Sequence, residues 1–258
     1  MPLRGLLISF YTIVRKDIVR MFRIWPQTFL PPVITSVLYF LIFGAFLGGR
    51  IGDVDGVPYA LFVVPGLVMM GVIMNSYSNV AFTFFTSKFF ARNIDEVLVS
   101  PTPPSILIAG FIAGGIVRGL IVGVLVLGVS LFFAPLAVHS ALVVALFFLL
   151  SSALFSLAGL VNGVYAKSID GINIVPTFVL TPLIYLGGIF YSVSILPPFW
   201  QSLSHFNPVF YLINGFRWGF LGSADVSLGL AISVLLGLVL ILTGVNWYIL
   251  KTGLGLKQ

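Results

Sequence analysis

Long, continuously apolar stretches alternate with short polar segments along the whole chain. Six stretches are long enough to cross a bilayer, because a ~30 Å hydrocarbon core requires about 20 apolar residues in a helix. They are Phe29–Leu47, Tyr59–Phe85, Ser105–Phe133, Ser140–Tyr165, Asn173–Tyr191 and Ser227–Leu250. The alternating pattern of a membrane β-barrel is absent from them. Since lipid offers no partner to free backbone groups, the pattern predicts an all-α integral membrane protein with six transmembrane helices.

Composition supports this fold class and excludes others. Of the 258 residues, 59% are hydrophobic and only 8% are charged, whereas soluble domains carry about 25% charged residues. A soluble enzyme is therefore excluded. Nucleic-acid binding is also not expected, because the net charge of +6 is not gathered into a basic stripe on a polar face.

The few charged residues predict the orientation in the membrane. Ten of the 13 Lys and Arg residues fall on one side: Arg4, Arg15, Lys16, Arg20, Arg23, Lys88, Arg92, Lys167, Lys251 and Lys257. The opposite side has only Arg50 and Arg217, and Arg118 falls inside the third stretch. Because cytoplasmic loops are enriched in Lys and Arg, we expect both termini in the cytoplasm.

Residues 1–26 predict an amphipathic helix that lies in the headgroup plane. One face is apolar and consists of Leu3, Leu7, Phe10, Val14, Ile18, Met21 and Trp25. The other face carries Ser9, Thr12, Lys16, Arg20 and Arg23. Such a helix serves as a membrane anchor, and it could in addition contact a cytoplasmic partner.

The cytoplasmic loop at residues 86–104 contains the signals of a short helix. Asn93 is a suitable N-cap, and Glu96 follows three residues later, as in a capping box; prolines from Pro101 onward end the helix. Val97 and Leu98 belong to its apolar face. A helix of about two turns is unstable alone in water, so this face requires a partner, either the bundle itself or a separate protein.

The outer segment at residues 192–226 breaks into apolar pieces that are too short to span, which predicts re-entrant or interfacial helices. Asn207 is expected to cap a helix opened by Pro208, and Arg217 in that helix is expected to pair with a carboxylate or a lipid phosphate. The segment is either a structural plug or an outer gate. The gate candidates are Pro197, Pro198, Asn207, Pro208, Tyr211 and Arg217.

Arg118 is a functional candidate because a charge inside a span normally faces protein or water. It lies either near the bilayer midplane or close enough to the inner surface to reach the headgroups. Five of the glycines in its helix, Gly110, Gly114, Gly115, Gly119 and Gly123, include three G-x-x-x-G pairs. These small residues predict close packing against another helix.

The chemistry that the chain lacks also informs its function. It has no cysteine and only two histidines, without metal-ligand spacing, and no catalytic constellation. Every Asp and Glu falls in a loop, at an edge or in the N-terminal helix, whereas an ion-coupled carrier usually needs an intramembrane carboxylate. No G-x-x-x-x-G-K-[ST] motif is present. We therefore expect neither an enzyme nor a cofactor of its own, and energy supplied by another polypeptide.

Several segments carry a resemblance to a known family. They are Arg23–Pro32, Val64–Met70, Arg92–Pro101, Val175–Pro182, Leu196–Trp200 and His205–Pro208 with Arg217. Over essentially its whole length the chain resembles the membrane permease subunits of type-2 ABC exporters, closely the bacterial YadH type and more loosely the nodulation and drug-exporter permeases. The resemblance implies one transmembrane domain over residues 1–258 in the bacterial inner membrane.

The resemblance also implies partners and residue roles. A second copy of the chain would pair with two ATPase subunits, which would bind ATP and Mg. The coupling helix would use Arg92, Asn93, Asp95, Glu96, Val97 and Leu98. A path between the two copies would include Tyr39, Phe43, Asn75, Asn79, Phe178 and Tyr185. Such a lining suits a lipid, glycolipid or hydrophobic drug; the alternative function is a stand-alone secondary transporter or channel.

Overall fold

The computed structural model describes residues 3–54, 56–90, 100–135 and 137–255. Four of the predicted spans are each a single helix: α4 (Tyr59–Phe89), α6 (Pro104–Ser130), α7 (Ala141–Tyr165) and α12 (Leu228–Thr252). The first span, Trp25–Ile51, is formed by α2 (Trp25–Tyr39), the π-helical segment η1 (Phe40–Phe46) and α3 (Gly48–Ile51). All six predicted stretches thus coincide with long helical segments.

The fifth span is helical but irregular, as its prolines predict. It consists of α8 (Ile169–Val175), the π-helical segment η2 (Pro176–Leu180) and α9 (Thr181–Leu186). A proline in a helix removes one backbone donor and leaves a carbonyl without its partner. Pro176 has no N–H for the Ile172 carbonyl four residues earlier, and Asn162 Nδ2 of α7 donates to that carbonyl at 3.0 Å, so a side chain of a neighbouring helix replaces the missing donor.

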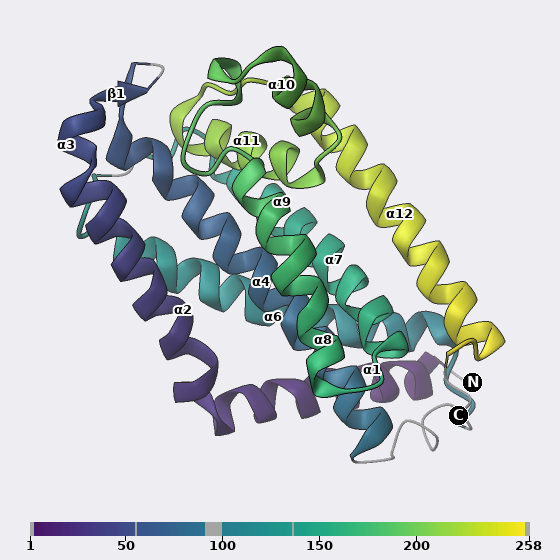
Figure 1. Ribbon diagram of the computed structural model, residues 1–258. Coiled ribbons are helices and arrows are strands. Elements are labelled where there is room, and N and C mark those ends of the chain that lie inside the picture. Colours follow the sequence, from purple (N-terminus) through teal and green to yellow (C-terminus); the bar gives the residue numbers. More distant parts are fainter. Residues whose placement is uncertain (1–2, 55, 91–99, 136, 256–258) are drawn as a thin grey trace.

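The remaining elements lie at the two ends of the helix bundle (Figure 1). At one end are the strands β1 (Asp53–Val54) and β2 (Val57–Pro58), which form a small antiparallel pair, and the helices η3 (Val193–Ile195), α10 (Pro198–His205) and α11 (Pro208–Leu221). Helix α1 (Leu3–Arg23) lies toward the other end, where both chain termini are also found. Two termini at one end agree with an even number of spans.

Helix α4 is the centre of the bundle, with α6, α7 and α11 packed around it. Its most apolar window is 67% buried, compared with 11% for the spans Trp25–Ile51 and Leu228–Thr252. The outer faces of those two spans carry the large exposed apolar side chains that a hydrocarbon environment favours. The core therefore lies around α4, and the first and last spans are peripheral.

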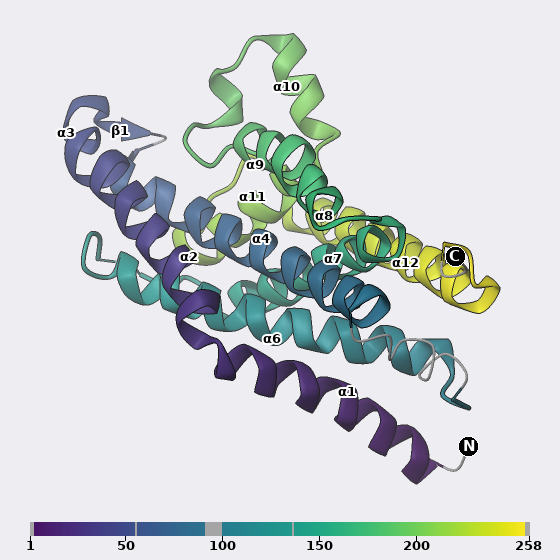
Figure 2. The same cartoon turned by 60° about the horizontal axis from the view of Figure 1, so that its bottom comes forward.

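The glycines of α6 serve two different neighbours. A Cβ at Gly115, Gly119 or Gly123 would collide with side chains of α4 and α7. A Cβ at Gly110 or Gly114 would instead collide with Ile13 and Asp17 of α1. One helix thus uses close approach on two faces, and one face receives the N-terminal helix rather than a spanning one. Figure 2 shows α1 beside α6.

Candidate functional site

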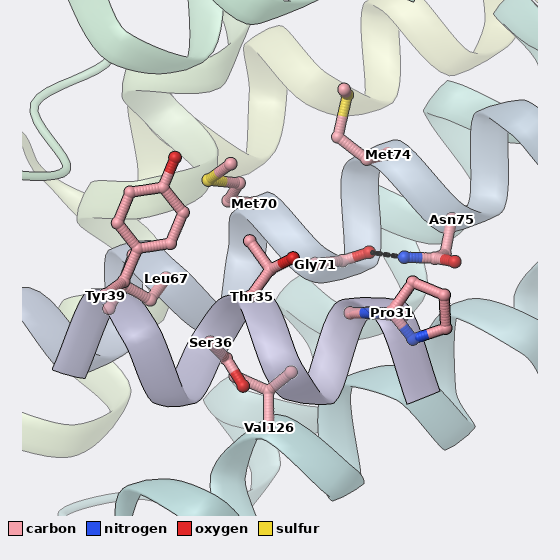
Figure 3. A pocket seen from close by; sticks show the side chains of 11 residues that line it. Pro31, Thr35, Ser36, Tyr39, Leu67, Met70, Gly71, Met74, Asn75 and Val126 are labelled. Atoms are coloured by element: carbon pink, nitrogen blue, oxygen red, sulfur yellow. Dashed lines mark hydrogen bonds between the residues drawn. The ribbon is translucent and has the colours of Figure 1, made fainter. Parts of the chain in front are cut away.

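A pocket of about 230 Å³ lies between α2, α4 and α6. Its lining is mostly apolar and consists of Pro31, Pro32, Thr35, Ser36, Tyr39, Leu67, Met70, Gly71, Met74, Asn75 and Val126. Pro31 and Asn75 lie at one end, and Tyr39 and Leu67 lie at the other (Figure 3). Two of the predicted path residues, Tyr39 and Asn75, line this pocket.

The local sequence explains why the pocket is apolar but adaptable. The two prolines lie inside α2. Between them and Tyr39, the residues of α2 that line the pocket are Thr35 and Ser36, which have short side chains. The Ser36 hydroxyl donates to the Val33 carbonyl at 2.8 Å, so it is occupied by its own helix. Met70 and Met74 supply flexible, polarisable walls that can fit ligands of different shape.

An aromatic cluster joins the first span to the fifth at the Tyr39 end of the pocket. The hydroxyls of Tyr39 and Tyr185 are 2.9 Å apart. Phe43 stacks on Phe190 with ring centroids 4.2 Å apart, and Tyr185 stacks on the same ring at 5.8 Å. The structure therefore brings together three predicted path residues, whereas Phe178 lies outside this cluster with 73% of its surface exposed.

A buried polar cluster joins α1 to α4 and α6; it comprises Asp17, Arg20, Asn75, Asn79, Thr83 and Arg118. Arg20 Nη2 lies 2.6 Å from Asp17 Oδ1 and also donates to Asn79 Oδ1 at 2.9 Å and to the Thr83 hydroxyl. Asn79 Nδ2 donates to Asp17 Oδ2 at 2.6 Å. Both carboxylate oxygens thus have donors, and the cluster fastens the N-terminal helix to the bundle.

The cluster places Arg20 differently from the prediction and shows where Asp17 and Asn79 lie. Arg20 does not lie on the outward polar face of α1 but turns into the bundle beside Asp17, so a carboxylate does lie among the helices. Leu3, Leu7 and Trp25 of the predicted apolar stripe are exposed on the surface of the bundle, and the buried residues of α1 are Asp17 and Met21. Asn79 is fully buried and bonded to the cluster, so it does not line the pocket.

Arg118 lies at the edge of the polar cluster. Its Nη2 donates to Asn75 Oδ1 at 3.3 Å, and its Nη1 donates to Asn79 Oδ1 at 3.4 Å. Both contacts are long for hydrogen bonds from a charged donor. Asn75 also donates to the Gly71 carbonyl at 3.0 Å (Figure 3), so its amide lies between Arg118 and the pocket.

The predicted gate residues form two short helices at the far end of the bundle. Asn207 caps α11, as expected: its Oδ1 accepts from the Val209 amide at 3.0 Å, and its Nδ2 donates to the Leu183 carbonyl at 2.6 Å. The Tyr211 hydroxyl donates to the His205 carbonyl at 2.8 Å, and Pro197 and Pro198 precede and open α10. These bonds fasten α10 and α11 to the end of the fifth span.

Arg217 of α11 is buried rather than placed at a lipid surface. Its Nη2 donates to the Gly188 carbonyl at 2.7 Å, and its guanidinium lies 3.8 Å from the centroid of the Phe62 ring. The side chain therefore connects α11 to α4 and to the segment that follows α9. The predicted contact with lipid phosphate does not agree with this burial.

The predicted coupling residues Arg92, Asn93, Asp95, Glu96, Val97 and Leu98 lie outside the described residues. The described ends of their loop are well connected. Lys88 Nζ donates to the Val164 carbonyl at 3.0 Å and to the Gly255 carbonyl at 2.6 Å. On the other side the Thr102 hydroxyl donates to the Ser9 hydroxyl at 3.3 Å, so this loop begins and ends at bonded helices.

Asp17 is the main residue that the sequence did not single out. Two separate features of the sequence relate to its position. Asp17 is a lone acid three residues before Arg20, and α6 contains the pair Gly110 and Gly114, whose partner helix the sequence does not identify. Only the packing of α1 on α6 brings the acid against Gly114 and Asn79.

The fold and these sites define a multi-pass membrane protein with a small apolar pocket among its helices. The chain belongs to the ABC-2 type transporter family, whose profile matches residues 8–221. It is therefore a non-enzymatic transport permease.

Among its relatives is the inner membrane transport permease YadH of Escherichia coli K12. It is 54% identical over 251 residues, which cover 97% of this chain and 98% of the relative. Nodulation protein J of Sinorhizobium fredii is 27% identical over 202 residues, covering 77% and 75%. Nodulation protein J of Rhizobium leguminosarum is 26% identical over the same length, covering 77% of each chain.

Proposed function

We propose that this chain is the membrane subunit of an ATP-driven exporter that moves an amphiphilic or hydrophobic substrate across the bacterial inner membrane. Two copies of a separate ATPase would hydrolyse ATP with Mg, and a second copy of this chain would complete the path. Both termini would lie in the cytoplasm. The observation that carries the proposal is the apolar pocket between α2, α4 and α6, which offers space for an acyl chain.

The composition of the pocket favours an amphiphile over an ion. An ion that leaves water must exchange its hydration shell for charged or carbonyl groups. The pocket wall is instead formed mainly by prolines, methionines and Leu67, and its polar groups are the neutral side chains of Thr35, Ser36, Tyr39 and Asn75. A lipid, glycolipid or drug would bury its apolar part there and gain from the hydrophobic effect.

An external ATPase agrees with the sequence and with the packing of α1. The 258 residues contain no G-x-x-x-x-G-K-[ST] motif that could hold ATP phosphates. The Ser9–Thr102 hydrogen bond and the Gly110–Ile13 approach place α1 beside the end of the coupling loop. A push on residues 92–98 by an ATPase would therefore act on α6 and α1 together.

We assign the segment of α10 and α11 to the outer side, where it would close the path as a gate. Gate opening would require the fifth span and α11 to move as one unit, because Asn207 bonds to Leu183 and Arg217 bonds to Gly188. Residues 1–26 would lie at the inner interface, since Arg15, Lys16 and Arg23 of α1 are exposed and charged groups avoid hydrocarbon.

The buried carboxylate gives the alternative, a stand-alone ion-coupled carrier, one observation in its favour. Asp17, however, is paired with Arg20 and accepts from Asn79 and Thr83. A proton-carrying acid must be exposed alternately to the two sides, whereas these bonds fasten Asp17 between helices. We therefore assign Asp17 to the attachment of α1.

Reconstitution with the partner ATPase tests the proposal. The complex in liposomes should show ATPase activity that rises with amphiphilic substrates. Glu96→Arg or Val97→Asp should abolish that rise while membrane insertion stays normal, because each places an unfavourable charge on the coupling face. Thr12→Val, on the exposed side of α1, is the matched control. Unchanged stimulation in both variants would refute the coupling assignment, and flux through the chain alone would favour the carrier.

A further inference from the structure

The polar cluster contains more positive than negative charge. Its ionisable members are two arginines and one carboxylate, and the carboxylate of Asp17 is paired with Arg20. Arg118 donates instead to neutral groups, the amide oxygens of Asn75 and Asn79, at 3.3 and 3.4 Å. Among the described residues its buried Nε has no hydrogen-bond partner. Within the described part of the chain, the guanidinium of Arg118 is therefore a cation without an ion-pair partner of its own.

An uncompensated cation inside a helix bundle is costly, and such residues usually face a ligand path or a counter-ion. Arg118 as a residue is only partly buried, although its Nε is fully buried. Guanidinium groups bind phosphate and carboxylate strongly, commonly through two parallel hydrogen bonds. The position thus favours an external anion.

Asn75 connects this cation to the apolar pocket. Its Nδ2 is held by the Gly71 carbonyl, which directs Oδ1 to Arg118. The same side chain lines the pocket at the end occupied by Pro31, opposite Tyr39 and Leu67 (Figure 3). The pocket therefore ends at an amide whose oxygen accepts from Arg118, and the guanidinium lies just beyond the lining residues at this end.

The packing of α1 indicates the level of Arg118 in the membrane. Gly110 and Gly114 of α6 contact α1, and the exposed Arg15 and Lys16 of α1 require water or headgroups around them. Arg118 follows Gly114 by four residues, or about 6 Å along the helix. Since α6 runs from Pro104 to Ser130, Arg118 lies near the middle of this helix, deeper in the bundle than the contact with α1.

We propose that the pocket binds an amphiphile with an anionic headgroup, a phosphate or carboxylate, which Arg118 binds beside Asn75 while the apolar chain extends toward Tyr39. In this orientation the headgroup lies nearer the inner surface than the apolar chain does, as in a lipid of the inner leaflet. Calling this ligand the substrate rests on the proposed exporter function. Binding of the ligand at this site does not require an ATPase.

Binding to the purified full-length chain in a neutral detergent tests the site directly. The probes are a lysophosphatidate and the monoacylglycerol with the same acyl chain, which differ only in the phosphate, and native mass spectrometry measures their occupancy. Wild-type protein should bind the phosphate form at least about tenfold more tightly, as expected for hydrogen bonds to a charged group. Arg118→Gln should remove this preference, and Arg118→Lys should keep part of it.

Asn75→Asp provides a second, independent variant, because it places a carboxylate between Arg118 and the ligand and should also remove the preference. Arg50→Gln, at an exposed arginine of α3, should bind both probes as the wild type does. Melting curves show which variants are folded, and either Arg118→Gln or Asn75→Asp suffices for the test. Equal affinity of wild type for the two probes, or a phosphate preference that persists in the folded variants, would overturn the proposal.

The ATPase of the reconstituted complex distinguishes the two sources of such a ligand. Stimulation by lysophosphatidate that requires Arg118 identifies cargo, whereas Arg118-dependent binding without stimulation identifies a resident lipid; both support the site. A complex stimulated equally by charged and neutral amphiphiles would leave the exporter function intact and refute the anionic preference. Absence of any ATPase partner would refute the exporter while leaving the binding result valid.

Discussion

Substitution of Gly114 by alanine should release the N-terminal helix from the bundle. An added Cβ would overlap Asp17 Oδ2 and approach its Cγ to 3.0 Å. Asp17 cannot move without losing its bonds to Asn79, Thr83 and Arg20, whose donors are held by α4 and α1. The small space at Gly114 is therefore required by the carboxylate that fills it.

The magnitude follows from the groups that would separate. Release of α1 breaks the hydrogen bonds from Asn79 and Thr83 of α4 to Asp17, each of which contributes about 1.5–3 kcal/mol because the acceptor is charged, while glycine to alanine in a helix recovers up to about 1 kcal/mol. We expect a net loss of roughly 2–4 kcal/mol in the stability of the α1 attachment. Gly128→Ala is the matched control in the same helix, because its added Cβ meets nothing within 4 Å and the change should be neutral or slightly stabilising.

A disulfide can report the attachment of α1 separately from global unfolding. The chain has no cysteine, and the hydroxyls of Ser9 and Thr102 are 3.3 Å apart. A Ser9→Cys, Thr102→Cys protein should therefore cross-link readily under mild oxidation, and adding Gly114→Ala should slow the cross-linking whereas Gly128→Ala should not. Wild-type melting and cross-linking rates in the Gly114→Ala protein would refute the reasoning.

Two further substitutions test other contacts by thermal or denaturant unfolding in detergent. Tyr39→Phe and Tyr185→Phe each remove the 2.9 Å hydroxyl contact and should cost about 0.5–1.5 kcal/mol; the double variant should cost clearly less than the sum, and strict additivity would exclude a direct interaction. Asn207→Ala removes the α11 cap and the bond to Leu183, so it should cost about 1–2 kcal/mol, whereas Ser202→Ala on exposed α10 should change stability by less than about 0.5 kcal/mol.

The sequence predicted several residues of the candidate site, but it did not predict how these residues are arranged in space. Tyr39, Asn75 and Tyr185 were expected near a path, and the pocket and the aromatic cluster include them. Asn79 was expected there too, but it lies one turn from Asn75 and is buried against Asp17. Residues four apart lie on the same face of a helix, so the difference arises from their positions along α4: the pocket reaches Asn75, whereas Asp17 of α1 contacts Asn79. The sequence of α4 gives no local signal of where α1 meets it.

Local hydropathy was sufficient to determine the six helical stretches, because hydrocarbon requires each spanning segment to satisfy its own backbone and to be apolar on all sides. The cap at Asn207 and the irregular fifth span could also be predicted, since capping and proline effects act over a few residues. Only the tertiary structure decided that α1 packs on Gly110 and Gly114 and buries Asp17 beside Arg20. That outcome depends on how two helices about 100 residues apart in the sequence fit together. The missing Cβ of Gly114 leaves space for the carboxylate of Asp17, and the three donors of this carboxylate come together only when the bundle has assembled.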